Sequence, residues 1–261
     1  MKPILRFLLS LAINLILFTP VFADLIEDRE LSLSAEGINA FEIDCGAGDL
    51  IVEGVEGLSN IEVRAEIIIE GMKDSRARDY IDKYLRLELV QKHGRAVLNS
   101  YFDRSMPTSL FSFGSQNALI NLFVKMPKNM DMRIDDGSGD TRISNISGDI
   151  DIDDGSGDLE IEFIGGNVDI DDGSGELVLS SIDGTVVIDD GSGEIRINDV
   201  TGDVDIDDGS GDIAVRKIGG SVAVDDGSGD ISIRHVGRDV DVIDDSSGDV
   251  SISYVEGRVR R

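Results

Sequence analysis

The sequence predicts an all-β protein that folds as a β-solenoid (β-helix) of about 18-residue, two-strand coils, with a small α/β insert. Three observations predict this fold class. A six-residue motif recurs at a fixed spacing, apolar residues alternate with others on both sides of it, and glycines occur at two places in each period. The motif, DDGSGD or DDGSGE, begins at Asp135, Asp153, Asp171, Asp189, Asp207 and Asp225, and a variant, DDSSGD, begins at Asp244.

One unit, residues 203–220, shows how a coil is built. Val204 and Ile206 alternate with aspartates before the motif, and Ile213 and Val215 alternate with other residues after it. Alternation of this kind is typical of a strand with one buried face. Each period therefore predicts two short strands, separated by a Gly-Ser-Gly turn and by a second glycine turn.

The Asp-Gly pairs leave a second architecture to consider, because Asp-Gly between alternating strands is a hairpin signal. An antiparallel meander of this length would expose one apolar face, and the chain has only one helical segment to cover it. A membrane barrel needs strands of about nine to eleven residues, and these have about five. A solenoid buries the apolar side chains of both strands against each other and pairs each strand with its copy one coil away. We therefore expect the solenoid.

Residues 1–23 are predicted to be a secretory signal peptide. Lys2 and Arg6 precede an apolar run that ends at Phe22, and small residues stand at the positions that a signal peptidase reads before Asp24. No later apolar stretch is long enough to span a bilayer. We expect an exported protein, in the periplasm or on the cell surface, with no membrane span after cleavage.

The mature chain divides into three predicted parts. Residues 24–72 form the N-terminal solenoid rungs and include an early motif copy, DCGAGD from Asp44, which lies 91 residues before Asp135, close to five periods. Residues 73–130 form a helix-hairpin-strand insert that caps or flanks one end. Residues 131–261 form the regular solenoid repeats with a C-terminal cap.

Local patterns place the elements of the insert and the irregular C-terminal end. Apolar residues at helical spacing predict a helix over 73–84, a hairpin turn is expected at His93-Gly94, and a loop is expected over 103–116. The last motif copy arrives after 19 residues, so an extra residue near Ile243 predicts a distorted last rung.

Composition excludes several classes of function. The chain has 52 acidic and 24 basic side chains and a net charge of −28, which repels phosphate backbones, so nucleic acid is not an expected partner. The chain has one Cys and two His, which are too few for an internal disulfide and make a zinc site or a Ser-His-Asp triad improbable. We therefore expect a protein that is not an enzyme and requires no cofactor.

Two segments carry a resemblance to a known family. The strand FVKMP, which ends at Pro127, introduces units such as ISGDIDIDDGSGDLEI, and Gly137-Ser138-Gly139-Asp140 is the first of several GSGD copies. In these features, over about residues 30–257, the chain resembles the bacterial putative-adhesin β-solenoid domain family, a family of unknown function. The resemblance implies an envelope-located β-solenoid with an adhesion-like role, and it carries no catalytic residues.

The motif places its acidic side chains in three predicted files along the solenoid. Because Val204 and Ile206 face inward, Asp207 faces outward, and Asp208 is expected at the turn. The first file, which faces outward, is Asp135, Asp153, Asp171, Asp189, Asp207, Asp225 and Asp244. The second file, at the turn, is Asp136, Asp154, Asp172, Asp190, Asp208, Asp226 and Asp245. The third file, after the turn, is Asp140, Asp158, Glu176, Glu194, Asp212, Asp230 and Asp249.

Repulsion within the files leaves two interpretations open. Unit charges about 4.8 Å apart repel by about 0.9 kcal/mol in bulk water, and Ca²⁺ prefers clustered oxygen ligands. The first file is therefore a candidate calcium site, with Asp135, Asp153, Asp171, Asp189, Asp207 and Asp225 as its ligands. Alternatively, Asp before Gly makes an Asx turn, and the outward file is a solvated face that discourages aggregation. The pattern matches neither the EF-hand loop nor the nonapeptide calcium repeat.

The preferred functional prediction is a non-enzymatic, exported scaffold for envelope adhesion or protein interaction, whose partner is an envelope protein or a glycan. The alternative is a polysaccharide-active enzyme of the β-helical type, because Arg216 and Arg234 share an outward column beside His235. Catalysis needs one unique arrangement of catalytic side chains, whereas here every coil repeats the same acidic residues.

Two regions are candidate contact surfaces. The residues at the outward positions of the second strand vary between coils. Such variation is expected of a surface that binds a partner, and also of a surface under no selection. These residues are Arg142, Glu160, Val178, Arg196, Ala214 and Ser232, then Ser144, Glu162, Ser180, Asn198, Arg216 and Arg234. The other region is the loop with Met106, Leu110, Phe111 and Phe113, which either contacts a partner or is buried against the insert helix.

Overall fold

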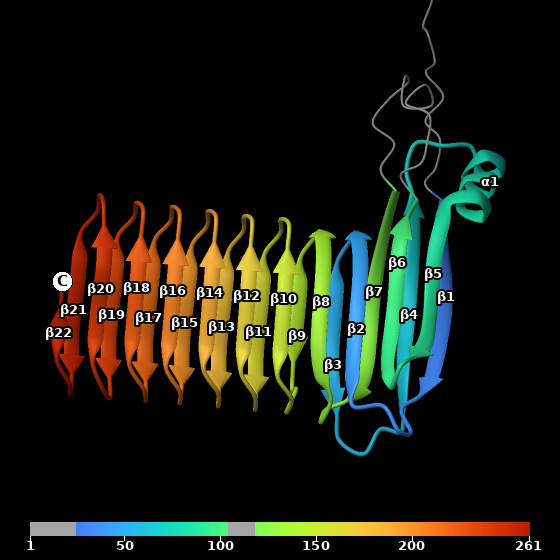
Figure 1. Cartoon of the computed structure of the whole chain (residues 1–261). Coiled ribbons are helices and arrows are strands. Elements are labelled where there is room, and N and C mark those ends of the chain that lie inside the picture. The colour runs from blue at the N-terminus through green and yellow to red at the C-terminus, as the bar shows by residue number, and fades with distance from the viewer. Residues whose placement is uncertain (1–24, 104–117) are drawn as a thin grey trace, which may run out of the picture.

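The structure is a computed structural model that describes residues 25–103 and 118–261, apart from the side chain of Asp245. These residues form a rod of two facing β-sheets of eleven strands each, with one helix at the N-terminal end (Figure 1). The predicted fold class, a β-solenoid of about 18-residue coils, is confirmed. Within the described residues, no helix is long and apolar enough to cross a membrane.

Each regular coil contributes one strand to sheet A and one to sheet B, and the strands of neighbouring coils pair in parallel. Ile152 lies beside Ile134 and Ile170 across sheet B, one coil away in each direction. The sheet B strands are β8 (Asp131–Ser138), β10 (Ile150–Asp154), β12 (Val168–Asp172), β14 (Val186–Asp190), β16 (Val204–Asp208), β18 (Val222–Asp226), β20 (Val240–Asp245) and β22 (Val259–Arg260). The sheet A strands are β9 (Thr141–Ser144), β11 (Leu159–Ile164), β13 (Leu177–Ile182), β15 (Ile195–Val200), β17 (Ile213–Ile218), β19 (Ile231–Val236) and β21 (Val250–Val255).

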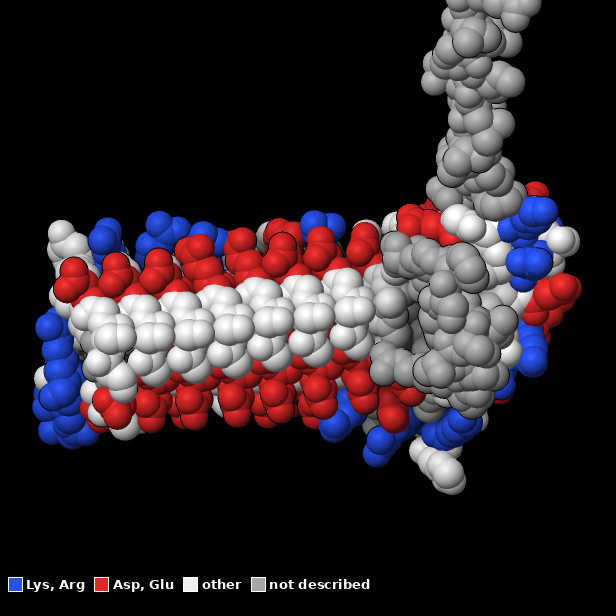
Figure 2. Space-filling model, turned by 90° about the horizontal axis from the view of Figure 1, so that it is seen from above, with Lys and Arg blue, Asp and Glu red and all other residues white. Residues whose placement is uncertain are grey.

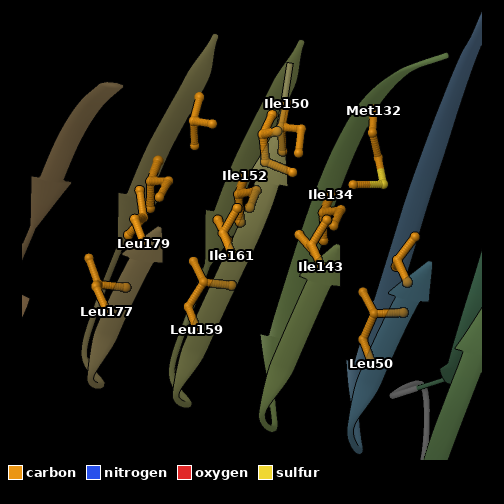
Figure 3. Packing of buried hydrophobic residues seen from close by; sticks show 14 of the residues in the cluster. Leu50, Met132, Ile134, Ile143, Ile150, Ile152, Leu159, Ile161, Leu177 and Leu179 are labelled. Atoms are coloured by element: carbon orange, nitrogen blue, oxygen red, sulfur yellow. The ribbon is translucent and has the colours of Figure 1, made fainter. Parts of the chain in front are cut away.

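The core is a continuous column of Val, Ile and Leu between the two sheets. Alternation directs every second side chain inward, so Ile152 of β10 and Ile161 of β11 lie at the same level in the interior (Figure 3). Each coil places its apolar side chains against the same residue types one coil away. Burial of this apolar area stabilises the rod by about 25 cal/mol per Å².

One residue in each sheet A strand interrupts the alternation. Phe163 in β11 has a φ of 59°, so Glu162 and Phe163 both avoid the core before Ile164 turns inward. The equivalent residues of other coils also have positive φ; they are Asn145, Ser181, Asp199, Lys217, His235 and Tyr254. Strict alternation would place Phe163 inside and Ile164 outside, whereas the structure has Phe163 outside and Ile164 in the core.

The early motif copy lies directly beside the regular repeat. Asp44 in β2 (Ala40–Ala47) pairs with Asp135, and β3 (Leu50–Val55) pairs with β9. The 91 residues therefore span a single coil in space, and not the five that the spacing suggests. The intervening chain lies on the other side of β2 and β3, because β6 (Arg95–Phe102) pairs with β2 and β7 (Ala118–Pro127) pairs with β3 (Figure 1).

The insert supplies much of the N-terminal end of both sheets. α1 (Asp74–Tyr84) matches the predicted helix, and β5 (Leu85–Lys92) forms an antiparallel hairpin with β6 through the expected turn at His93-Gly94. β1 (Leu25–Ser34) and β4 (Asn60–Ile69) pair antiparallel and extend sheet A beyond β7. The strands of the insert thus continue the two sheets at the N-terminal end of the rod.

The C-terminal end is irregular, as the 19-residue step predicts. The register between β18 and β20 shifts after Val224, and the extra residue, Ile243, is 64% exposed. Arg258 and Arg260 then form ion pairs with Asp239 and Asp241, at 3.6 and 3.2 Å. Charged side chains at this end discourage further strand addition.

Candidate functional site

The first file lies on the outward side of sheet B, beside the Gly-Ser-Gly edge of the rod. Seen from above this edge, a stripe of uncharged residues is bordered on each side by a row of acidic side chains (Figure 2). Asp153 is exposed between the buried Ile152 and Asp154. No three or more His, Cys, Asp or Glu side chains in the described part of the chain are grouped to hold a metal ion. Calcium binding at Asp135, Asp153, Asp171, Asp189, Asp207 and Asp225 stays a prediction.

The second file lies inside the rod, which corrects the expectation that it lies at the turn. Asp208 is the last residue of β16 and is 2% exposed. The parity that directs Val204 and Ile206 inward applies to Asp208 as well, because it is two residues further along the same strand. The buried members of this file are Asp136, Asp154, Asp172, Asp190, Asp208 and Asp226.

From Asp154 to Asp226, each buried aspartate uses one oxygen to fix the turn that follows it. The Ser210 N–H donates to Asp208 Oδ1 at 2.9 Å, and Ser156 donates to Asp154 in the same way at 3.1 Å. These are the Asx turns that the sequence predicts. The second oxygen, Oδ2, is buried without a hydrogen-bond partner among the described residues in Asp154, Asp172, Asp190 and Asp208.

In the first regular coil a side-chain hydroxyl is the partner of the buried aspartate, and Asp136 Oδ1 is the oxygen without a hydrogen-bond partner among the described residues. Thr141 Oγ1 donates to Asp136 Oδ2 at 2.9 Å. Leu159 occupies the equivalent position one coil later, and leucine or isoleucine follows in the next coils. Replacing this hydroxyl by an alkyl group removes the donor, which explains why the later Oδ2 atoms have no partner.

Burial raises the pKa values of five members of the second file, which are Asp136, Asp154, Asp172, Asp190 and Asp208. Burial raises the pKa of Asp154 to about 7, and its neighbours Asp136 and Asp172 raise it further by charge repulsion. Burial likewise raises the pKa of Asp172 and of Asp208 to about 6, and the serine N–H bonds oppose this rise. These carboxyl groups therefore stay protonated and uncharged at mildly acidic pH, where exposed aspartates are already ionised, and they ionise as the pH rises through about 6 to 7.

Cys45 takes the place of the second aspartate in the coil formed by β2 and β3. It pairs with Asp136 across sheet B and is buried and free of any disulfide. Burial raises the pKa of its thiol well above the usual value, and the Asp136 charge adds to this effect. The thiol is therefore protonated and unreactive, and it acts as a small core residue.

The third file connects successive coils. The backbone N–H of Glu176 donates to Asp158 Oδ1 at 3.1 Å, and the N–H of Asp230 donates to Asp212 Oδ1 at 3.0 Å. Each donor is the residue at the same position of the next coil. The opposite edge of the rod repeats this arrangement, since the N–H of Asn167 donates to Asp149 Oδ1 at 2.7 Å. These carboxylates are acceptors for the backbone, so their position is explained without a cation.

The glycines of the turn are required by the close stacking of coils. Gly157 has a φ of 144°, and a Cβ atom there would lie 1.9 Å from the carbonyl oxygen of Gly139 in the coil before it. No side chain fits at that distance. The repeated GSG sequence is therefore dictated by the stacking of turns at one coil spacing.

The outward face of sheet A contains a shallow groove of about 460 Å³. Its floor includes Ala214 and Ser232, whose small side chains leave space between larger neighbours. Arg196, Arg216 and Arg234 line it together with Val178, Ser180 and Asn198. The residues at these positions vary from coil to coil in the sequence, and the structure brings them together in one groove.

The third outward position of sheet A is a feature that alternation alone misses. His235 and Tyr254 occupy it in successive coils, and their rings stack with centroids 4.7 Å apart. Tyr254 is 73% exposed and Phe163 is 54% exposed.

The signal peptide over 1–23 and the loop with Met106, Leu110, Phe111 and Phe113 lie outside the described residues.

Comparisons with known proteins support the fold. No family model matches the chain, and no curated protein matches its sequence. Among solved structures, a "putative lipid binding protein" of Parabacteroides distasonis has 16% sequence identity and a TM-score of 0.52. A "putative adhesin" of the same organism has 15% identity and a TM-score of 0.51. In both cases the match covers 90% of this chain and 96% of the other.

The chain shares the fold of these proteins. The resemblance inferred from the GSGD coils is thus confirmed for the architecture. At this identity the likeness says nothing about individual site residues.

Proposed function

We propose that this chain is an exported, non-enzymatic β-solenoid that acts as an adhesin-like contact scaffold of the cell envelope. One observation carries the proposal: the core and the GSG edge repeat from coil to coil, while the outward side chains of sheet A differ. Two solved structures with the same fold support it through their names, since one is called a putative adhesin and the other a putative lipid binding protein.

The construction of the rod suits recognition. Each outward side chain stands on a strand that is paired on both sides and supported by buried neighbours, as Arg216 is between Asn198 and Arg234. A surface held in this way loses little conformational entropy when a partner binds. Repeat proteins commonly use such extended faces for binding.

The enzymatic alternative has no support in the groove that holds its candidate residues. Arg216 and Arg234 line the groove, but its lining contains neither a carboxylate nor a histidine. Hydrolysis of a glycosidic bond canonically uses a pair of carboxyl groups about 5 to 10 Å apart around the bond. We therefore propose binding without turnover.

Two measurements test the proposal. Fractionation of cells that express the full chain with a C-terminal tag should find a processed protein in the envelope fraction, and an unprocessed cytoplasmic product would contradict export. The purified mature chain should also bind isolated envelopes of the source organism saturably. A protein that is processed but fails to bind would contradict the contact role.

A matched pair of variants then identifies the binding face. Glu160→Lys with Glu162→Lys reverses two charges on sheet A, and Asp151→Lys with Asp169→Lys reverses two on sheet B. Each pair disrupts one surface ion pair, since Glu160 binds Arg142 and Asp151 binds Arg133. We expect the sheet A pair of substitutions to change envelope binding and the sheet B pair to leave it within twofold of the wild type. A change in binding with the sheet B pair and none with the sheet A pair would contradict the proposal.

A further inference from the structure

Two guanidinium groups in the sheet A groove have no carboxylate partner. Arg196 forms ion pairs with Glu176 and Glu194. Arg216 instead donates from Nε to the amide oxygen of Asn198 at 3.1 Å, and neither it nor Arg234 forms an ion pair with any described residue. In a chain with a net charge of −28, two adjacent unneutralised arginines are unexpected.

The acidic groups nearest in sequence are engaged elsewhere. Asp212 and Asp230 belong to the third file, and each uses Oδ1 to accept a backbone N–H of the next coil. The first file lies on sheet B, on the opposite face of a two-layer rod about 10 Å thick between its sheets. Charges are largely screened beyond about 8 Å at physiological ionic strength, so the first file does not neutralise the two guanidinium groups. Basic side chains project beyond one acidic row over the C-terminal half of the rod (Figure 2).

The groove offers more than charge. Arg216 and Arg234 are paired neighbours on β17 and β19, so they lie about one strand spacing, 4.8 Å, apart. Asn198, Ser180 and Ser232 add hydrogen-bonding groups along the same surface. Guanidinium groups bind carboxylates through two parallel hydrogen bonds, and hydroxyl and amide groups suit sugar hydroxyls.

We propose that this groove binds an anionic polysaccharide whose sugars carry carboxylate groups. This inference rests on the proposed contact function and names its partner. Arg216 and Arg234 bind carboxylates of the glycan, and the polar side chains between them and Val178 bind its hydroxyl groups. A groove of about 460 Å³ fits a short stretch of an extended chain better than a folded protein domain, which needs about 800 Å² of contact.

The test uses the purified mature chain and polygalacturonate oligomers, with dextran oligomers of similar length as the neutral control. Calorimetry at physiological salt should detect binding of polygalacturonate and none of dextran. Arg216→Gln with Arg234→Gln should weaken the affinity about tenfold or more. The matched control, Arg133→Gln with Arg142→Gln, removes the same charge from residues that already have carboxylate partners at 3.1 and 3.0 Å, and should change affinity less than threefold.

Three results would overturn the inference. The first is that the wild type does not bind polygalacturonate. The second is that the two double variants weaken binding equally. The third comes from sedimentation of the wild type and the Arg216/Arg234 variant, if the variant loses self-association while its glycan binding is unchanged. The last result would assign the groove to the acidic face of a second copy. Circular dichroism confirms that each variant is folded. Envelope binding that persists without polygalacturonate binding would reject this partner and leave the contact function intact.

Discussion

Ser210 donates its backbone N–H to Asp208 Oδ1 at 2.9 Å, while Asp208 Oδ2 is buried without a hydrogen-bond partner. The same half-satisfied geometry recurs in the preceding coils at Asp190 and Asp172. A buried, ionised carboxylate with one free oxygen is costly, and stacking such groups adds repulsion. The second aspartate of the motif is therefore a structural residue that is most stable as a neutral acid.

The raised pKa values predict that the rod loses stability as pH rises. The folded state binds protons more tightly than the unfolded chain at Asp154, Asp172 and Asp208, whose pKa values rise from 3.8 to about 7, 6 and 6. Their contribution is fully present below pH 4 and is lost as pH rises through 6 to 7. Urea unfolding should show a free energy of unfolding about 3 kcal/mol or more higher at pH 5 than at pH 8. A constant or increasing value would contradict this sign.

Asp208→Asn should stabilise the protein at pH 8 by about 1 to 2 kcal/mol. Asparagine keeps the oxygen that accepts the Ser210 N–H and replaces the charged, unpartnered oxygen by a neutral donor. Asp207→Asn, on the exposed side of the same strand, is the control and should change stability by less than about 0.5 kcal/mol. The interior assignment fails if the two substitutions have equal effects.

Asp158→Ala should destabilise the rod by about 1 kcal/mol, because it removes the acceptor of the Glu176 N–H in the next coil. Asp158→Asn retains an acceptor and should restore most of this loss. Glu160→Ala is the surface control, since Glu160 makes only an exposed ion pair with Arg142. Chemical denaturation of the three variants measures the difference. An alanine variant as stable as the wild type would show that these hydrogen bonds between coils contribute nothing to stability.

Gly157→Ala should cost more than about 3 kcal/mol or prevent folding, because its Cβ would overlap the Gly139 carbonyl oxygen at 1.9 Å. Gly57→Ala is a control for backbone strain alone, since Gly57 has a φ of 70° and open space around it, and should cost about 1 kcal/mol. Thermal unfolding separates the two. Similar shifts in Tm would mean that turn stacking is looser than described.

The calcium prediction for the first file needs a comparison of salts. If Asp171, Asp189 and Asp207 bind Ca²⁺ in the folded state, about 5 mM CaCl₂ should raise Tm more than NaCl at equal ionic strength. Changing all three to Asn should remove the difference. Equal shifts in both salts, or an unchanged calcium response in the variant, would leave this file as a solvated face.

The sequence predicts the solenoid because alternation and an 18-residue spacing recur together, and the burial of Val204 and Ile206 follows directly. The interior place of Asp208 was predictable from the same parity, but the Asp-Gly turn signal favoured an external turn. The position of Asp44 beside Asp135 could not be predicted, since the sequence spacing does not say on which side of a coil an insert folds. The third outward position depends on the positive φ of residues such as Lys217, which has no sequence signature of its own.

Direct titration of the aspartate carboxyl groups tests the central claim, that the second file is buried and keeps its protons to a higher pH than exposed aspartates do. In the chain labelled with ¹³C at aspartate carboxyls, NMR should find a small set of signals that titrate near pH 6 to 7, apart from the exposed majority. Asp154→Asn, Asp172→Asn and Asp208→Asn should each remove one of them. If every aspartate titrates near 3.8, or if the late-titrating signals survive these substitutions, the account of the motif is wrong.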